Sequence, residues 1–111
     1  QAVPAKDDGE PQDVIRIGGV TIHLLNRTVH VEGNEIELTP KEFDLLALLA
    51  RHPERAFSRE ALLDQVWDID FAGGTRTVDI HVQRLRKKLG RQQGIIQTVY
   101  GIGYKSTETF T

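Results

Sequence analysis

The sequence predicts an α+β fold in which four short antiparallel strands are followed by three helices and a C-terminal β-hairpin. Apolar and polar residues alternate over residues 14–38, and apolar residues then recur at helical spacing over residues 39–89. A second alternating run, interrupted by glycines, follows at residues 95–106. These patterns place the folded domain at residues 14–106, which is long enough for a single modest core.

The two ends of the chain are expected to lie outside this domain. Residues 1–13, "QAVPAKDDGEPQD", are polar, contain two prolines and show no apolar period, so we expect a flexible linker there. Residues 107–111 form a short C-terminal tail. Because the chain begins with Gln1 and contains no methionine, the sequence also suggests a piece of a longer protein.

The first part of the domain is expected to be an antiparallel meander. Its strands are predicted at residues 14–17, 20–25, 28–31 and 35–38. The turns between them are predicted at Gly18 and Gly19, at Asn26 and Arg27, and at Gly33 and Asn34. The alternation leaves one face of this sheet apolar, so helices must cover that face.

The first helix has a clear start signal. Thr39 suits the N-cap, Pro40 suits the first helical position, and Glu42 completes a capping box with Thr39. Pro53 ends the helix. Its apolar residues occupy more than half of the circumference, which predicts a buried helix; they are Phe43, Leu45, Leu46, Ala47, Leu48, Leu49 and Ala50.

A short second helix and a longer third helix follow. Ser58 is the expected N-cap of the second helix. The apolar stripe of that helix is Ala61, Leu62 and Val66. Residues 68–74, "DIDFAGG", are expected to form a loop, after which Thr75 opens the third helix and Gly90 ends it.

The third helix is predicted to bury one stripe and to expose a basic face. The buried stripe is Val78, Val82, Leu85 and Leu89. The outward positions are Arg76, Thr77, Ile80, His81, Gln83, Arg84, Lys87 and Lys88. Residues 75–105 carry seven Lys and Arg against Asp79 alone, a net charge of +6 in a chain whose total is −2. Repulsion among these bases should destabilise an isolated helix by a few tenths, roughly, of a kcal/mol per close pair. The pattern therefore favours a negatively charged partner.

Three interpretations of this face remain open on the pattern alone. A helix of about 14 residues is roughly 21 Å long and fits a DNA major groove. There Arg reaches guanine O6 and N7, and Ile80 could touch a thymine methyl group. The second helix, the loop and this helix together form a helix-turn-helix pattern. We favour nucleic-acid binding over a face that docks another protein and over a merely solvated face.

Three long motifs connect the chain to a known family. The segments "LTPKEFDLLALLARHPERAFSREALLDQVW", "TRTVDIHVQRLRKKL" and "IQTVYGIGYK" occur in this order. Together they resemble the DNA-binding effector domain of the OmpR/PhoB family of bacterial two-component response regulators. The resemblance covers residues 14 to about 106 and implies a winged helix-turn-helix whose C-terminal hairpin is the wing.

The resemblance also implies what surrounds this domain and what it binds. An N-terminal receiver domain, phosphorylated by a cognate histidine kinase in a phosphorelay, would lie outside this chain and be joined through the linker. The domain would regulate transcription by binding double-stranded DNA with direct-repeat half-sites about 10 to 11 bp apart, as a head-to-tail dimer. It would also contact RNA polymerase, in the cytoplasm of a bacterium.

Individual positions take their expected roles from the same resemblance. Family positions that meet DNA on the recognition helix match Arg76, Thr77, His81, Gln83 and Arg84, and basic positions closer to phosphate match Arg86 and Lys87. Ile80 and Lys88 join this set through their place on the helix. Thr98 matches a contact to the DNA backbone before the wing, Trp67 lies close to the backbone, and Tyr104 belongs to the wing. The segment that contacts RNA polymerase matches Asp68, Ile69, Asp70, Phe71, Ala72, Gly73 and Gly74.

One residue departs from the family pattern. The family usually has an arginine before the G-x-G of the wing, and that arginine enters the minor groove. Here the residue is Tyr100, which can form hydrogen bonds with phosphate or sugar but supplies no cation to a narrow A/T-rich groove. We therefore expect less minor-groove recognition by this wing.

Other kinds of function find no support in the sequence. The four histidines are scattered and lack metal-ligand spacing, and "DIDFAGG" lacks the further carboxylates of a calcium loop. The absence of cysteine excludes disulfides and thiolate metal sites. No serine lies in a nucleophile-elbow context, and no apolar run is long enough to span a membrane. We expect neither enzymatic activity nor a cofactor, metal or membrane partner; the alternative function is a winged-helix protein-docking module without DNA binding.

Overall fold

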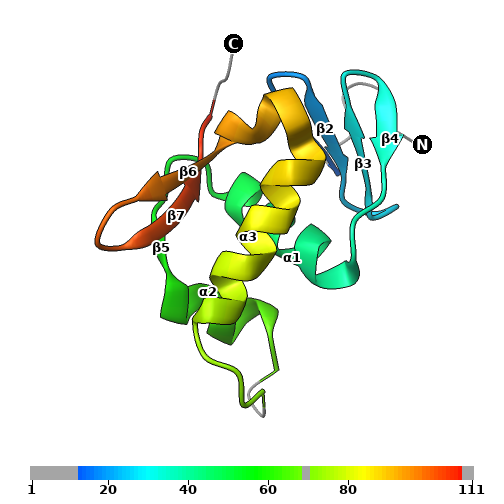
Figure 1. The fold of residues 1–111 in the computed structure, drawn as a ribbon. Helices are drawn as coiled ribbons and strands as arrows, with labels where there is room; N and C mark the ends of the chain where they lie inside the picture. Colours follow the sequence, from blue (N-terminus) through cyan, green and yellow to red (C-terminus); the bar gives the residue numbers. More distant parts are fainter. Residues whose placement is uncertain (1–12, 69–70, 109–111) are drawn as a thin grey trace, which may run out of the picture.

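A computed structural model describes residues 13–68 and 71–108. Helix α3 (Arg76–Leu89) crosses the middle of the molecule, with a four-stranded sheet on one side and a smaller sheet on the other (Figure 1). Helices α1 (Pro40–Arg51) and α2 (Arg59–Val66) complete the layer behind α3. The α+β class and the order of the three helices are as the sequence predicts.

The N-terminal sheet confirms the predicted meander. It consists of β1 (Val14–Ile17), β2 (Val20–His23), β3 (Thr28–Val31) and β4 (Asn34–Ile36), all antiparallel and in sequence order. The register aligns one apolar row across the four strands, formed by Ile15, Ile22, Val29 and Ile36. Because neighbouring side chains on one face of a sheet pack together, this row and the paired Ile17 and Val20 on the same face pack into the core.

Two of the predicted strands are too long. Strand β2 ends at His23 rather than at residue 25, because residues 24–27 form the turn to β3; the Leu24 N–H still donates to the Asp13 carbonyl across from it. Leu25 then lies in the turn with 81% of its surface exposed. Strand β4 covers residues 34–36 rather than 35–38, since the chain leaves the sheet to enter the N-cap of α1.

Helix α1 begins with the predicted capping box. The Thr39 hydroxyl accepts the Glu42 N–H, and the Glu42 carboxylate accepts the Thr39 N–H at 2.9 Å. All the apolar residues of α1 are buried except Leu48, which is partly buried. Helix α2 begins at the predicted cap, Ser58, whose hydroxyl accepts the Ala61 N–H.

The core stripe predicted for α3 is fully buried, with exposures of 0 to 1% for Val78, Val82, Leu85 and Leu89. Thr75 precedes the helix, but its side chain makes no capping hydrogen bond; its carbonyl instead accepts the Val78 N–H. At the other end, the backbone turns at Gly90 with φ of 60°, a conformation that favours glycine.

The C-terminal hairpin is present, and it is joined by two elements that the sequence did not predict. Strands β6 (Ile96–Val99) and β7 (Gly103–Ser106) form the hairpin, and β5 (Phe57–Ser58) pairs with β7 as a third strand. A 3₁₀ helix, η1 (Gly90–Ile95), connects α3 to β6. The wing is therefore anchored to the segment before α2 as well as to the end of α3.

The chain after β7 remains attached to the domain. Thr107, which we placed in the tail, is buried and donates its N–H to the Ile95 carbonyl. The Ser106 hydroxyl donates to the Leu49 carbonyl at 2.9 Å. Within residues 13–68 and 71–108, no helix is both long and apolar enough to cross a membrane.

Candidate nucleic-acid interface

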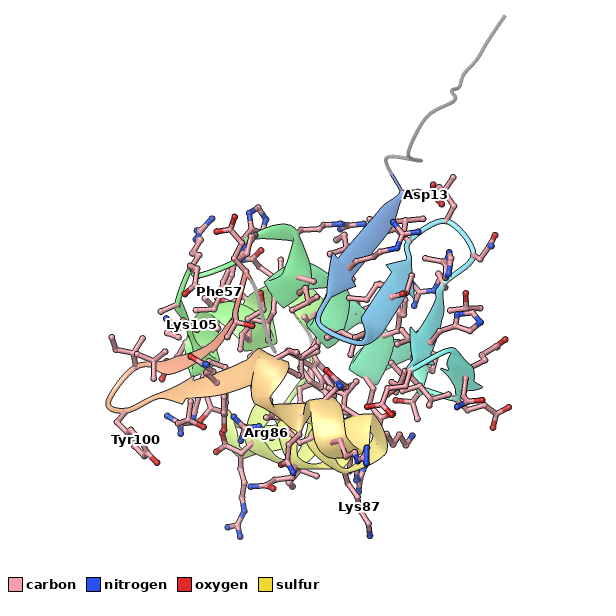
Figure 2. The ribbon with its side chains drawn as sticks, turned by 90° about the horizontal axis from the view of Figure 1, so that it is seen from above. Asp13, Phe57, Arg86, Lys87, Tyr100 and Lys105 are labelled. Atoms are coloured by element: carbon pink, nitrogen blue, oxygen red, sulfur yellow. The ribbon has the colours of Figure 1, made fainter. Side chains whose placement is uncertain are left out.

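The outward face of α3 presents most of the predicted DNA-binding residues together. Six of these side chains are exposed: Arg76, Ile80, Gln83, Arg84, Lys87 and Lys88. Lys87 points away from the body of the protein in Figure 2. In the described part of the chain, Arg84 and Lys87 make no hydrogen bond or ion pair. Their charges are therefore available to a ligand.

Arg86 turns from α3 toward the wing instead. Its guanidinium donates to the Ile96 carbonyl at 2.9 Å and to the Thr98 hydroxyl at 2.9 Å, and it lies 5.5 Å from the centre of the Tyr104 ring. Arg86 and Thr98, both predicted to contact phosphate, are therefore hydrogen-bonded to each other. Both acceptors are neutral, so the hydrogen bonds leave the positive charge of Arg86 without an opposite charge.

Lys88 lies at the edge of the basic face, and its ammonium forms an ion pair with a buried carboxylate of the domain. Its ammonium donates to the Glu42 carboxylate at 2.7 Å, and that carboxylate is 1% exposed. Burial raises the pKa of Glu42, but the Lys88 ammonium and the Thr39 N–H together hold that pKa below its usual range. Lys88 therefore joins α3 to the start of α1, and its predicted contact with DNA would compete with this ion pair.

His81 is oriented by contacts on two sides. Its Nδ1 lies 2.9 Å from the Thr77 carbonyl, and because a carbonyl only accepts, Nδ1 carries a proton in this contact. The imidazole also packs edge-on against Trp67, with 4.9 Å between ring centres. Trp67 is only 7% exposed. Its structural role is therefore to support His81, and its predicted proximity to the DNA backbone would involve little of its surface.

Asp79, the single acid of the basic helix, is the centre of a small cluster. Its Oδ1 accepts the Tyr104 hydroxyl at 2.6 Å and the Arg59 Nε at 2.7 Å. Burial raises the pKa of Asp79, but the hydrogen bonds from Tyr104 and Arg59 lower it by more. The net pKa lies below its usual value, so the carboxylate remains charged. Burial and the Asp79 charge raise the pKa of Tyr104. The cluster connects α3, α2 and β7 at one point.

The wing carries the departure from the family pattern at its tip. Tyr100 is 91% exposed and lies at the end of the hairpin, far from the body of the domain (Figure 2). Gly101 beside it has φ of 81°, which supplies the turn. Tyr104, assigned to the same set from the sequence, is 5% exposed and belongs to the core. Of the two tyrosines, only Tyr100 is placed to reach a ligand.

The loop predicted to contact RNA polymerase is described in part. Ile69 and Asp70 lie outside the described residues; Asp68, Phe71, Ala72 and Gly74 are exposed, and Gly73 is partly buried. The Phe71 ring lies 6.1 Å from the Trp67 ring. A Cβ added at Gly73 would overlap the far edge of the Phe71 ring, so that exposed ring would have to move aside.

Sequence reasoning missed the residues that position this interface. Arg59, Asp79 and Glu42 each hold a residue of α3 or the wing in place, yet no DNA contact was expected of them. The signal that could have found two of them is charge. Asp79 stands alone among bases, and Glu42 lies on a helix face that is otherwise apolar. In the described residues, no group of three or more His, Asp or Glu is arranged to hold a metal ion.

Comparison with known proteins assigns the family. The profile of the family "Transcriptional regulatory protein, C terminal" matches residues 33–106. The chain belongs to this family. It is 48% identical over 99 residues to the uncharacterized transcriptional regulatory protein YclJ of Bacillus subtilis, covering 87% of this chain and 44% of that protein. It is 42% identical over 104 residues to the DNA-binding response regulator MtrA of Mycolicibacterium smegmatis, covering 91% of this chain and 46% of that protein.

Solved structures place this family member among OmpR/PhoB domains. DrrB of Thermotoga maritima, an OmpR/PhoB homolog, aligns with a TM-score of 0.78 and 31% identity, over 86% of this chain and 44% of DrrB. The DNA-binding domain of Klebsiella pneumoniae RstA, solved in complex with the RstA box, aligns with a TM-score of 0.75 and 34% identity. That alignment covers 87% of this chain and 99% of the RstA domain. The winged helix-turn-helix fold is confirmed.

Membership of this family also bears on the activity of this chain. The family is one of transcription regulators and not of enzymes, in agreement with the sequence analysis. The chain spans less than half the length of the curated relatives that it matches.

Proposed function

We propose that this chain is the output domain of a response regulator, and that it binds double-stranded DNA in a sequence-specific manner to regulate transcription. The observation that carries the proposal is that some basic side chains of α3 are bound within the domain while others are exposed. Lys88 is paired with Glu42, and Arg86 is bound to the wing, whereas Arg84 and Lys87 are exposed without a partner in the described residues. Unpaired cationic side chains on an exposed helix favour binding to the phosphate-lined groove of a DNA duplex.

The geometry gives each part of α3 a separate role. Arg84 and Gln83 lie on the outward face with Ile80, where they can form hydrogen bonds or apolar contacts with base edges in the major groove. Lys87 supplies a point charge for phosphate, which adds affinity without sequence information. Because His81 Nδ1 is engaged with the Thr77 carbonyl, Nε2 is the ring nitrogen that remains for a contact with DNA.

The wider context belongs to the same proposal. We place a receiver domain and its histidine kinase outside this chain, and we place the domain on direct-repeat DNA as a head-to-tail dimer in the bacterial cytoplasm. Residues 68–74 form the surface for RNA polymerase. Support comes from the family match and from relatives named as response regulators, MtrA among them.

The first test is selection of bound duplexes from a random pool, with the wild type and Arg84→Ala in parallel. The wild type is expected to enrich two direct half-sites about 10 to 11 bp apart. Arg84→Ala is expected to bind the selected site with about 1–3 kcal/mol less free energy and to relax the base preference at one position of each half-site. Lys87→Ala is the control, because it should weaken all duplexes alike.

The competing function is a protein-docking module that never binds DNA. It predicts that the wild type enriches no duplex, while a partner protein remains bound after nuclease treatment and in high salt. Enrichment of a single half-site without a repeat would instead contradict the head-to-tail arrangement and leave DNA binding in place.

A further inference from the structure

A polar groove separates the recognition helix from the wing. Its volume is about 570 Å³, and it lies between the C-terminal half of α3, the 3₁₀ helix η1 and strand β6. We call it the wing groove. Its polar side chains are Gln83, Arg86, Gln93, Gln97, Thr98 and Tyr100. The labelled Arg86 lies at its α3 side and Tyr100 at the wing tip in Figure 2.

The chemistry of the wing groove favours an anion. No Asp or Glu lines it, and Arg86 donates its hydrogen bonds to a carbonyl and a hydroxyl, which neutralise none of its charge. Gln93 and Gln97 are exposed and form no side-chain hydrogen bond within the described residues. Each amide carries two N–H donors, so the walls can donate to several oxygens at once.

The position of the wing groove identifies its occupant. Gln83 belongs both to the outward face of α3 and to the groove lining, so the two surfaces are continuous. A duplex that seats its major groove on α3 must therefore bring one of its strands toward the wing. A single cation with several neutral donors matches the one charge and several oxygens of a phosphodiester linkage.

We propose that the wing groove binds one sugar–phosphate strand of the duplex through the amides of Gln93 and Gln97, with Arg86 as the charge at its base. This inference rests on the proposed function and adds two residues and a mode of contact to it. Amide donors bind phosphate without replacing condensed cations, and only cations do that. Gln93 and Gln97 therefore contribute affinity that does not depend on salt.

The test compares Gln93→Ala/Gln97→Ala with the wild type on the duplex selected by the wild type. Two neutral hydrogen bonds are lost, so affinity should fall about tenfold, while the slope of log K against log salt stays unchanged. The matched control is Gln65→Ala, an exposed glutamine in a separate groove beside α1, which should bind as the wild type does. Because all three side chains are exposed, thermal unfolding should be the same in each variant.

A second measurement identifies the strand. Phosphates of the selected duplex are replaced one at a time by neutral methylphosphonates, and binding is measured for the wild type and the double variant. Replacement of one particular phosphate should weaken binding by the wild type. The same replacement should weaken binding by the double variant clearly less, because that variant lacks the amides that contact this phosphate.

The outcomes separate the two proposals. Failure of the wild type to bind any duplex would overturn both. Wild-type binding with equal affinity of the double variant would overturn the wing-groove inference alone. A shallower slope of log K against log salt in the double variant would also overturn this inference. The glutamines would then contribute by positioning a cationic side chain against phosphate and not by their own hydrogen bonds. Binding of an acidic peptide by the groove, unaffected by duplex, would overturn DNA as its occupant.

Discussion

Gly103→Ala is expected to lower the free energy of unfolding by about 3 kcal/mol, at the upper end of the usual range for overpacking. At Gly103 the β7 backbone passes so close to β5 that an added Cβ would overlap the Phe57 carbonyl oxygen and lie 3.1 Å from the Ser58 Cα. Backbone atoms on both sides are fixed by pairing of β5 with β7, so they cannot move aside as a flexible side chain would. Chemical denaturation of the two proteins measures the difference.

Gly74→Ala is the matched control for this change. No atom lies within 4 Å of a Cβ built at Gly74, and its backbone is not in the left-handed region. We therefore expect its stability to remain within about 0.5 kcal/mol of the wild type. If Gly103→Ala were as stable as Gly74→Ala, that result would contradict the close packing of the wing against β5.

Asp79→Ala should have the second largest effect, a loss of about 2 kcal/mol of unfolding free energy, mainly from the charge-assisted hydrogen bond that the Tyr104 hydroxyl donates to this carboxylate. Tyr104 is 5% exposed, and its hydroxyl would lose the carboxylate that accepts it. The Arg59 contribution is smaller, because that side chain is 36% exposed and its charge is screened by solvent. Removal of the acid thus weakens the attachment of α3 to α2 and β7 together.

Tyr104→Phe and a pH series check the origin of this loss. Tyr104→Phe removes the hydroxyl together with its need for a partner, so it should destabilise less than Asp79→Ala. The folded pKa of Asp79 is lowered, so the stabilisation from its charge is complete above its ordinary pKa and is lost as the pH falls through the lower folded value. Asp79→Asn should therefore lose less stability than the wild type over that acidic interval. Equal stability of Asp79→Ala and the wild type would contradict the role of the cluster.

The sequence predicted most of the structure that depends on neighbours along the chain, apart from the ends of β2 and β4. The capping box of Thr39 and Glu42 and the Ser58 cap are signals contained within four residues, and both are present. The buried stripe of α3 followed from helical periodicity for the same reason. Local patterns thus predicted the three helices, the meander and the hairpin.

Long-range pairing could not be predicted in the same way. Strand β5 contains only Phe57 and Ser58, and its partner lies more than forty residues later in β7. Two residues carry no alternation that would indicate a strand. The 3₁₀ helix η1 also lacks a periodic signal, because it follows directly on α3 and includes two glycines.

The candidate site shows the same limit at the level of side chains. The helical projection placed Lys88, and the family resemblance placed Arg86, among the expected DNA contacts. The side chains of Arg86 and Lys88 instead reach partners ten and forty-six residues away, Ile96 and Glu42. Projection gives the direction of Cβ and not the course of a flexible chain beyond it. It therefore predicted which helix is basic, and the structure distinguishes the charges that are free from those that hold the domain together.

The salt dependence of duplex binding tests DNA recognition by α3 most directly. Affinity of the wild type and of Lys87→Ala for the selected duplex is measured by fluorescence anisotropy from about 50 to 200 mM salt. For the wild type, log K should fall linearly with log salt, and the slope should become shallower by about 0.9 when the single charge of Lys87 is removed. A wild-type affinity that does not change with salt would contradict the claim that this face of α3 binds DNA.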